Sequence, residues 1–174
     1  MNKSLFKWEF YGVFIMFIFF SLFHFTYELT GFKFFALFSA VNESVWEHLK
    51  LGFYAGLLFY FGEYSFLGKY SPNFLPAKAL ALYVIPVFIM ITFYGYTSIL
   101  GRHYLWLDIL IAFLSCVAAQ IVSYSIISSK NDFSEFSKTA IILILLGIVV
   151  FTLFTFYPPR IPLFFDKSNN KFGI

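Results

Sequence analysis

Long stretches without a single charge dominate this sequence. The run from Ala79 to Leu100 contains no charged side chain, and it is longer than the roughly 20 residues that a helix needs to cross the hydrocarbon core of a bilayer. Charged residues make up 12% of the chain, about half the share that is usual in a soluble domain. Apolar runs of this length favour membrane-spanning helices, in which every backbone polar group is satisfied internally.

The chain is therefore predicted to be an all-α integral membrane protein with one domain over residues 1–174, a bundle of five transmembrane helices. The expected helices cover about residues 8–29, 43–66, 78–100, 104–128 and 139–157, and an interfacial tail covers residues 158–174. Pro158 and Pro159 end the last helix, because a proline ring cannot continue the hydrogen-bond ladder. Gly52 and Gly56 form a GxxxG pair, which permits close helix packing.

The predicted location is the cell membrane, with the lipid bilayer as the main partner. Lys3 and Lys7 precede the first helix, which favours a cytoplasmic N-terminus. The net charge is only +3 and the basic residues are spread out, so we expect no nucleic-acid partner. The single cysteine, Cys116, excludes an intrachain disulfide bond.

Five crossings would gather most of the polar chemistry at one end of the bundle. The 30–42 connection, the 101–103 turn and the tail share this end with all three histidines, both arginines and five of the nine acids. At the other end we expect water to solvate the remaining acids, which lie in loops or at helix ends. These acids are Glu9, Glu63, Asp132 and Glu135.

The stretch from Asn42 to Lys50 carries the candidate catalytic residues Glu43, Glu47 and His48. Glu43 and Glu47 stand one helical turn apart, where two carboxylates repel and therefore invite a cation or a shared proton. Further nitrogen and oxygen donors on other expected helices would complete a ligand set suited to a divalent metal such as Zn, Fe or Mn. The predicted metal ligands are His24, Glu28, Glu47, His48 and Asp108.

Three residues of the same end are predicted to bind substrate: Arg102, His103 and Arg160. The guanidinium fork of arginine matches a phosphate or carboxylate headgroup. Simpler interpretations stay open: Glu47 pairs with Lys50, and Asp108 neutralises Arg102. The sequence contains no HExxH, GxSxG or P-loop motif, so it does not establish whether the protein is an enzyme.

Three stretches together resemble a family of small bacterial and archaeal integral membrane proteins without an assigned activity. They are Val41 to Lys50 (VNESVWEHLK), Tyr96 to Gly101 with the following Leu107 to Ile109, and Tyr157 to Phe164 (YPPRIPLF) with Phe172 to Ile174. The resemblance implies a five-helix membrane fold and transfers no reaction. It also points to Asn42, Trp46 and Asp166 as site residues, in addition to residues already named. We assign these three to substrate binding.

Three functions fit these observations. The first is a membrane-embedded site that binds a metal ion or performs proton chemistry on a small or lipidic substrate. The second is a transporter or channel subunit, which would need to form a homo-oligomer because five helices are few for a conduit. The third is a non-catalytic membrane partner, in which the polar cluster sets only the specificity of folding.

Overall fold

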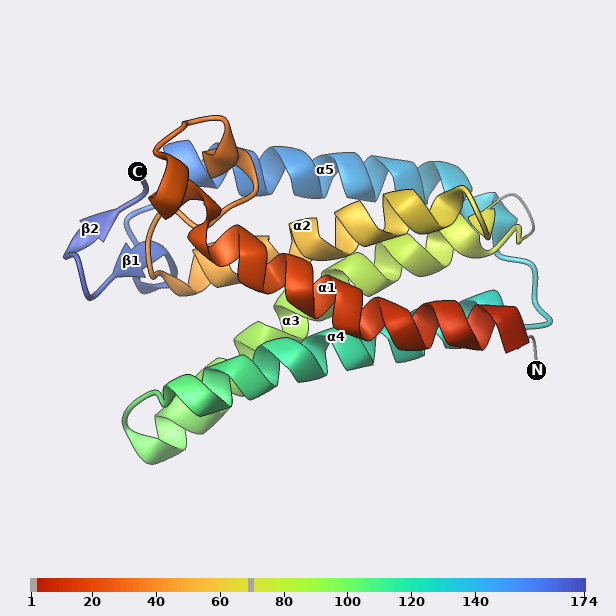
Figure 1. Ribbon diagram of the computed structural model, residues 1–174, viewed down its shortest axis with the longest axis horizontal. Helices are drawn as coiled ribbons and strands as arrows, with labels where there is room; N and C mark the ends of the chain where they lie inside the picture. The colour runs from red at the N-terminus through yellow and green to blue at the C-terminus, as the bar shows by residue number, and fades with distance from the viewer. Residues whose placement is uncertain (1–2, 69–70) are drawn as a thin grey trace.

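Five long helices and a short C-terminal hairpin form the computed structural model, which describes residues 3–68 and 71–174 (Figure 1). The helices are α1 (Lys3–Thr30), α2 (Val45–Tyr64), α3 (Phe74–Leu100), α4 (Leu105–Ile127) and α5 (Ser137–Phe156). Short 3-10 turns are η1 (Phe35–Leu37), η3 (Ser134–Phe136) and η4 (Pro162–Phe164), and the hairpin pairs β1 (Phe165–Asp166) with β2 (Lys171–Phe172). The predicted all-helical bundle is confirmed.

Four helical stretches are long and apolar enough to cross a membrane: Lys3–Thr30, Phe74–Leu100, Leu105–Ile127 and Ser134–Phe156. They carry large exposed apolar side chains along their outer faces; on α5, for example, Ile142 is 63% exposed and Val149 is 59% exposed. In water such a surface would be unfavourable, and against lipid it costs nothing. The exterior of the bundle is therefore membrane-like.

Helix α2 is the internal helix of the bundle. Twelve of its 20 residues are buried, against four of 20 in α5, and Figure 1 shows it enclosed by α1, α3 and α5. The GxxxG pair explains its close approach to α3: a Cβ at Gly52 would lie 2.4 Å from Ile85, and one at Gly56 would lie 3.0 Å from Leu82. Because α2 faces protein on most sides, it can carry charges that a lipid-facing helix could not.

The α3–α4 hairpin leans away from the other helices at its tip, as Figure 1 shows at the lower left. Gly101 makes this tip possible, because it adopts a left-handed backbone with φ of 72°, which a residue without Cβ reaches without strain. The residues of the tip are thereby separated from the ends of α1 and α2.

The expectation that Glu9 and Glu63 are solvated is wrong. Glu9 is 4% exposed and Glu63 is 1% exposed. Both carboxylates contact the ammonium of Lys78, Glu9 at 2.9 Å and Glu63 at 2.6 Å. Their sequence positions near helix ends suggested water, but α1, α2 and α3 converge there and cover all three side chains.

Candidate functional site

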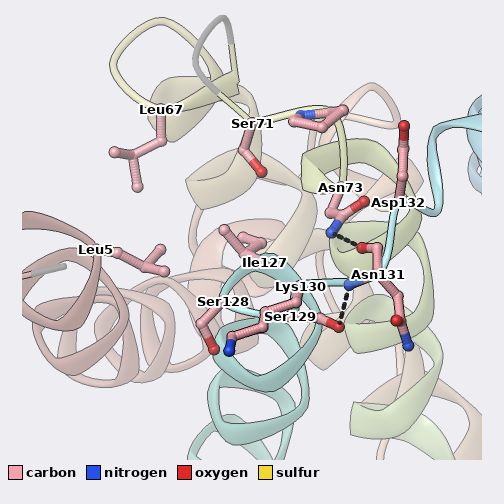
Figure 2. Close-up of a pocket in the computed structure, with 11 residues that line it drawn as sticks. Leu5, Leu67, Ser71, Asn73, Ile127, Ser128, Ser129, Lys130, Asn131 and Asp132 are labelled. Carbon is pink, nitrogen blue, oxygen red and sulfur yellow. Dashed lines mark hydrogen bonds between the residues drawn. The ribbon is translucent and has the colours of Figure 1, made fainter. Parts of the chain in front are cut away.

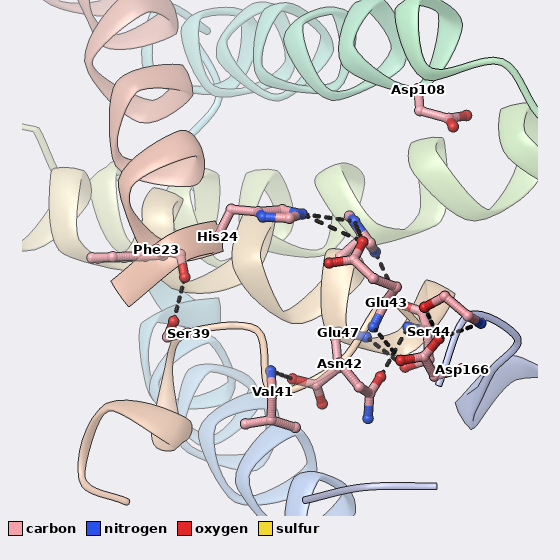
Figure 3. Close-up of polar contacts among 12 residues, drawn as sticks. Phe23, His24, Ser39, Val41, Asn42, Glu43, Ser44, Glu47, Asp108 and Asp166 are labelled. Carbon is pink, nitrogen blue, oxygen red and sulfur yellow. Dashed lines mark hydrogen bonds and ion pairs between the residues drawn. The ribbon is translucent and has the colours of Figure 1, made fainter. Parts of the chain in front are cut away.

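Two histidines and one glutamate converge where the end of α1 meets the start of α2. His24 Nε2 lies 3.2 Å from His48 Nε2. Glu43 Oε2 lies 3.7 Å from the first nitrogen and 3.6 Å from the second. Figure 3 shows the side chains of His24 and Glu43 pointing toward each other. Each of the three side chains offers one possible metal-ligand atom, and these atoms all lie within 4.8 Å of one another. Among the described residues, no other group of three or more His, Cys, Asp or Glu side chains does so.

Helix α2 starts in a way that orients His48. Ser44 is the N-cap, and its side chain accepts a hydrogen bond from the backbone N–H of Glu47, which satisfies one of the free donors of the first turn. The carbonyl oxygen of Ser44 lies 2.9 Å from His48 Nδ1. A carbonyl can only accept, so Nδ1 carries a proton, and the lone pair of a neutral His48 is on Nε2, facing His24.

Ser39 ties the chain before α2 to α1 beside His24. Its hydroxyl accepts a hydrogen bond from the backbone N–H of Tyr27 at 2.8 Å and donates to the carbonyl of Phe23. The N–H of Ala40 also donates to this carbonyl, at 3.3 Å. These bonds hold the connection against the last turns of α1 and so fix the distance between the two histidines.

The C-terminal hairpin holds the backbone of Glu43. Asp166 is fully buried and accepts hydrogen bonds from the N–H of Glu43 at 3.1 Å, and from Ser168 and Asn169. Burial raises the pKa of Asp166, but the hydrogen bonds from Ser168, Asn169 and Glu43 outweigh it and hold the pKa well below its usual range. Asp166 therefore remains ionised and fixes the loop that presents the Glu43 side chain.

Asn42 makes the second link to the tail. Its amide nitrogen donates to the carbonyl of Gly173 at 2.8 Å, and its Oδ1 accepts from the N–H of Ser44 at 2.9 Å. Asn42 is 6% exposed, so it joins the loop to the tail and offers no open surface to a substrate.

Glu47 lies apart from the histidines, in a buried ion pair. Its Oε2 is 2.6 Å from Lys50 Nζ and 3.1 Å from the N–H of Val41. Lys50 also donates to the carbonyl of Ala36 and to Thr155 Oγ1, at 2.9 and 2.8 Å. All three ammonium protons are thus used, and the pair connects α2, η1 and α5.

Trp46 packs in the core. Its ring lies against Phe151 and Phe154 of α5 and against Phe164 of η4, with centroid separations of 4.8, 5.5 and 4.7 Å. It is 9% exposed. Trp46 therefore anchors the tail on α5.

Asp108, His103 and Arg102 form a separate group at the α3–α4 tip. Asp108 accepts from the hydroxyl of Tyr96 and lies 3.0 Å from His103 Nδ1. Arg102 donates to the hydroxyl of Tyr104 at 2.8 Å. Figure 3 shows Asp108 well apart from His24, so the structure does not bring this group to the histidines.

The last two predicted site residues, Glu28 and Arg160, are exposed. Glu28 lies one turn beyond His24 on α1, and it is outside the group of ligand atoms that lie within 4.8 Å. Arg160 lies in the tail directly after Pro158 and Pro159, with an exposed side chain. Neither residue belongs to the cluster, which consists of His24, Glu43 and His48.

Sequence reasoning named Asn42 and Asp166 but missed Ser44 O and Ser39, which also hold this cluster in place. It also missed Thr155, which supports the neighbouring Glu47–Lys50 pair. Ser44 O had a local signal, since it lies four residues before His48, the spacing of neighbours on a helix. Ser39 and Thr155 had none, because their partners lie far away in the chain. Only the tertiary packing of the 39–42 loop and α5 reveals them.

Comparison with known proteins gives one result. A family model described as a family of unknown function (DUF6512) matches residues 1–174. No curated protein and no solved structure matches the chain.

Proposed function

Because the chain belongs to the DUF6512 family of unknown function, we propose a function from its site: His24, Glu43 and His48 bind a divalent transition metal near one face of the membrane. The observation that carries this proposal is the convergence of two imidazole nitrogens and one carboxylate oxygen within 4.8 Å. Two histidines and one glutamate are the protein ligands of well-known catalytic zinc and iron sites.

The spacing fits a metal. Two nitrogens bound to one Zn²⁺ at about 2.0–2.1 Å in tetrahedral geometry lie about 3.3 Å apart, and His24 Nε2 and His48 Nε2 are 3.2 Å apart. The corresponding nitrogen–oxygen separation is about 3.4 Å, slightly less than the 3.6 and 3.7 Å to Glu43. The Glu43 side chain is 52% exposed, so a small rotation closes this difference.

The supporting contacts of His48 and Glu43 fit a metal as well. A histidine that binds a metal usually donates its other ring N–H to a carbonyl or carboxylate, which fixes the tautomer. His48 does so through Ser44 O. The buried Asp166 holds the backbone of the third ligand, Glu43, without entering the site.

Three protein ligands leave a coordination position for water or substrate, which is typical of catalytic rather than structural sites. A bound metal would supply Lewis-acid chemistry there. His24 lies about 9 Å before the end of α1, counted at 1.5 Å per residue, and the exposed side of Glu43 opens the site. We therefore propose a site that is accessible from the membrane surface.

Proton transfer is the second candidate function, because the 3.2 Å separation of the two nitrogens is also a hydrogen bond. With His48 Nδ1 bonded to Ser44 O, the Nε2–H of His24 would donate to His48 Nε2. Glu43 would then exchange the proton with water. This function needs no metal, so metal analysis separates the two.

Metal content of the detergent-purified protein tests the proposal. We expect one Zn, Fe or Mn per chain, and a loss of affinity of at least about 10-fold in His48→Ala and in Glu43→Gln. His103→Ala is the matched control, since it removes a histidine at the α3–α4 tip, and it should bind metal like the wild type. Wild-type protein that binds none of these ions at micromolar concentration would exclude the metal site.

A further inference from the structure

A second polar cluster lies at the opposite end of the bundle from the histidines. Glu9 of α1, Glu63 of α2 and Lys78 of α3 meet there. Glu9 precedes His24 by 15 residues and Glu63 follows His48 by 15 residues, so the two clusters are separated by about 22 Å along both antiparallel helices. The cluster therefore belongs to a different site.

The charges of this cluster do not balance. Two carboxylates face one ammonium, and the three residues are 4%, 1% and 1% exposed. Helix α4 contributes only uncharged groups: Ser123, which donates to Glu9 Oε1 at 2.7 Å, Gln120, and Cys116. Tyr60 of α2 adds a ring 4.5 Å from Lys78 Nζ. A net negative charge buried among such groups is costly unless it is neutralised.

The cluster also has too few hydrogen-bond donors. Lys78 and Ser123 both donate to Glu9 Oε1. Among the described residues, four acceptor oxygens in and beside the cluster have no hydrogen-bond partner: Glu9 Oε2, both oxygens of Glu63, and Gln120 Oε1. Of these, Glu63 Oε2 has only its ion pair with Lys78. The hydroxyl of Tyr60 is also without a partner there. One proton on a carboxylate would supply a donor and cancel the excess charge at once.

A pocket lies at the same end of the bundle, one helical turn beyond the cluster along the chain. It has a volume of about 470 Å³ and is lined by Leu5, Leu67, Asn73, Ile127 and the polar loop 128–132. Leu5 is one helical turn before Glu9, Leu67 is one turn after Glu63, and Ile127 is one turn after Ser123. Figure 2 shows Leu5, Leu67 and Ile127 around the hollow. These apolar side chains separate the cluster from the polar mouth.

Hydrogen bonds from Asn73 hold the mouth of the pocket in place. Asn73 donates to the carbonyls of Ile126 and Asn131 at 3.2 and 2.8 Å, and its Oδ1 accepts from the N–H of Phe133 at 2.8 Å. These bonds hold the 128–133 loop over the ends of α3 and α4. Lys130 and Asp132 place charges beside the hollow, so water can enter as far as the apolar layer.

We propose that Glu9, Glu63 and Lys78 form a proton-binding site that takes up one proton from the water of this pocket. The proton adds to a carboxylate of the glutamate pair, with no other bond made or broken, and it leaves by the same route. The ammonium of Lys78 holds the second carboxylate ionised. The protonated cluster is neutral, and the deprotonated cluster carries one negative charge.

Infrared titration of the protein in lipid nanodiscs tests this proposal. We expect a protonated carboxyl group whose midpoint lies at least one pH unit above the value of about 4.3 for a solvated glutamate. Glu63→Gln and Glu9→Gln should each abolish this titration, because two opposite charges then remain. Glu135→Gln removes an exposed acid near the same end of the bundle and should leave the titration unchanged.

The glutamine variants should fold, since an amide has the shape of a protonated carboxyl group. Lys78→Met provides an independent check, because loss of the ammonium should raise the midpoint further. The proposal is overturned if the wild type shows no carboxyl group that titrates above the solvated range. It is equally overturned if the titration persists in either glutamine variant. Neither result bears on metal binding by His24 and His48.

Discussion

The buried pair of Glu47 and Lys50 gives the sharpest test of how the site is supported. Lys50→Met removes the ammonium and keeps a side chain of similar length. Three contacts are lost, to Glu47 Oε2 at 2.6 Å, to Thr155 Oγ1 at 2.8 Å and to the carbonyl of Ala36 at 2.9 Å. The carboxylate of Glu47 then stays buried with only the N–H of Val41 and the Thr155 hydroxyl near it.

Breaking a buried ion pair by removing one partner costs about 3–5 kcal/mol, because a buried charge is left uncompensated. Lys50 is 0% exposed and Glu47 is 1% exposed, so solvent screening does not reduce this value. We therefore expect Lys50→Met to lower the free energy of unfolding by about 3–5 kcal/mol. The exposed Lys33→Met is the matched control and should change it by no more than about 0.5 kcal/mol.

The double variant Glu47→Gln/Lys50→Met separates charge from packing. It removes both charges, so we expect it to be about 2 kcal/mol or more closer to the wild type than Lys50→Met alone. Reversible unfolding in mixed detergent micelles measures all four proteins. A cost below about 1 kcal/mol for Lys50→Met would refute the reasoning, since it would mean that water reaches the pair. The same result would return Glu47 to consideration as a ligand.

Two further predictions concern packing and pH. Gly52→Ala should lower the free energy of unfolding by about 1–3 kcal/mol, because its Cβ would lie 2.4 Å from Ile85 and overpack the α2–α3 contact. Gly62→Ala in the same helix is the control, since nothing lies within 4 Å of its Cβ. It should be neutral or slightly stabilising in the same micelle assay. Asp166→Asn should destabilise the tail at neutral pH. The folded pKa of Asp166 is depressed, so the stability that its carboxylate contributes is fully present above the ordinary pKa of 3.8. This stability is lost as the pH falls through the folded pKa. Proteolysis of the tail at several pH values measures this difference between variant and wild type, and a difference that does not shrink below about pH 4 would contradict the assignment.

The two clusters together show how α2 is used. This helix carries His48 and the Glu47–Lys50 pair near its start and Glu63 near its end, and the apolar helices α1, α3 and α5 enclose it (Figure 1). Burial of α2 lets a protein with few charges keep several of them away from lipid. The histidine cluster is half-open, whereas the Glu9–Lys78–Glu63 cluster is closed.

The class of fold could be predicted from the amino-acid sequence, because charge-free runs longer than about 20 residues leave few alternatives to membrane helices. The sequence also pointed to His24 and His48, since imidazoles within apolar helices need a reason to be there. Local patterns of this kind depend only on neighbours in the chain, which is why they are readable.

Which polar residues meet could not be predicted in the same way, because it depends on how the helices pack. Glu43 and Glu47 are one turn apart in sequence, yet Glu43 lies before α2 and faces the histidines, whereas Glu47 turns inward to Lys50. Asp108 looked like a ligand by type, but the lean of the α3–α4 hairpin takes it to His103. Glu9 and Glu63 looked solvated and are buried with Lys78. Each outcome depends on how whole helices pack, and packing against distant segments leaves no mark in a local pattern.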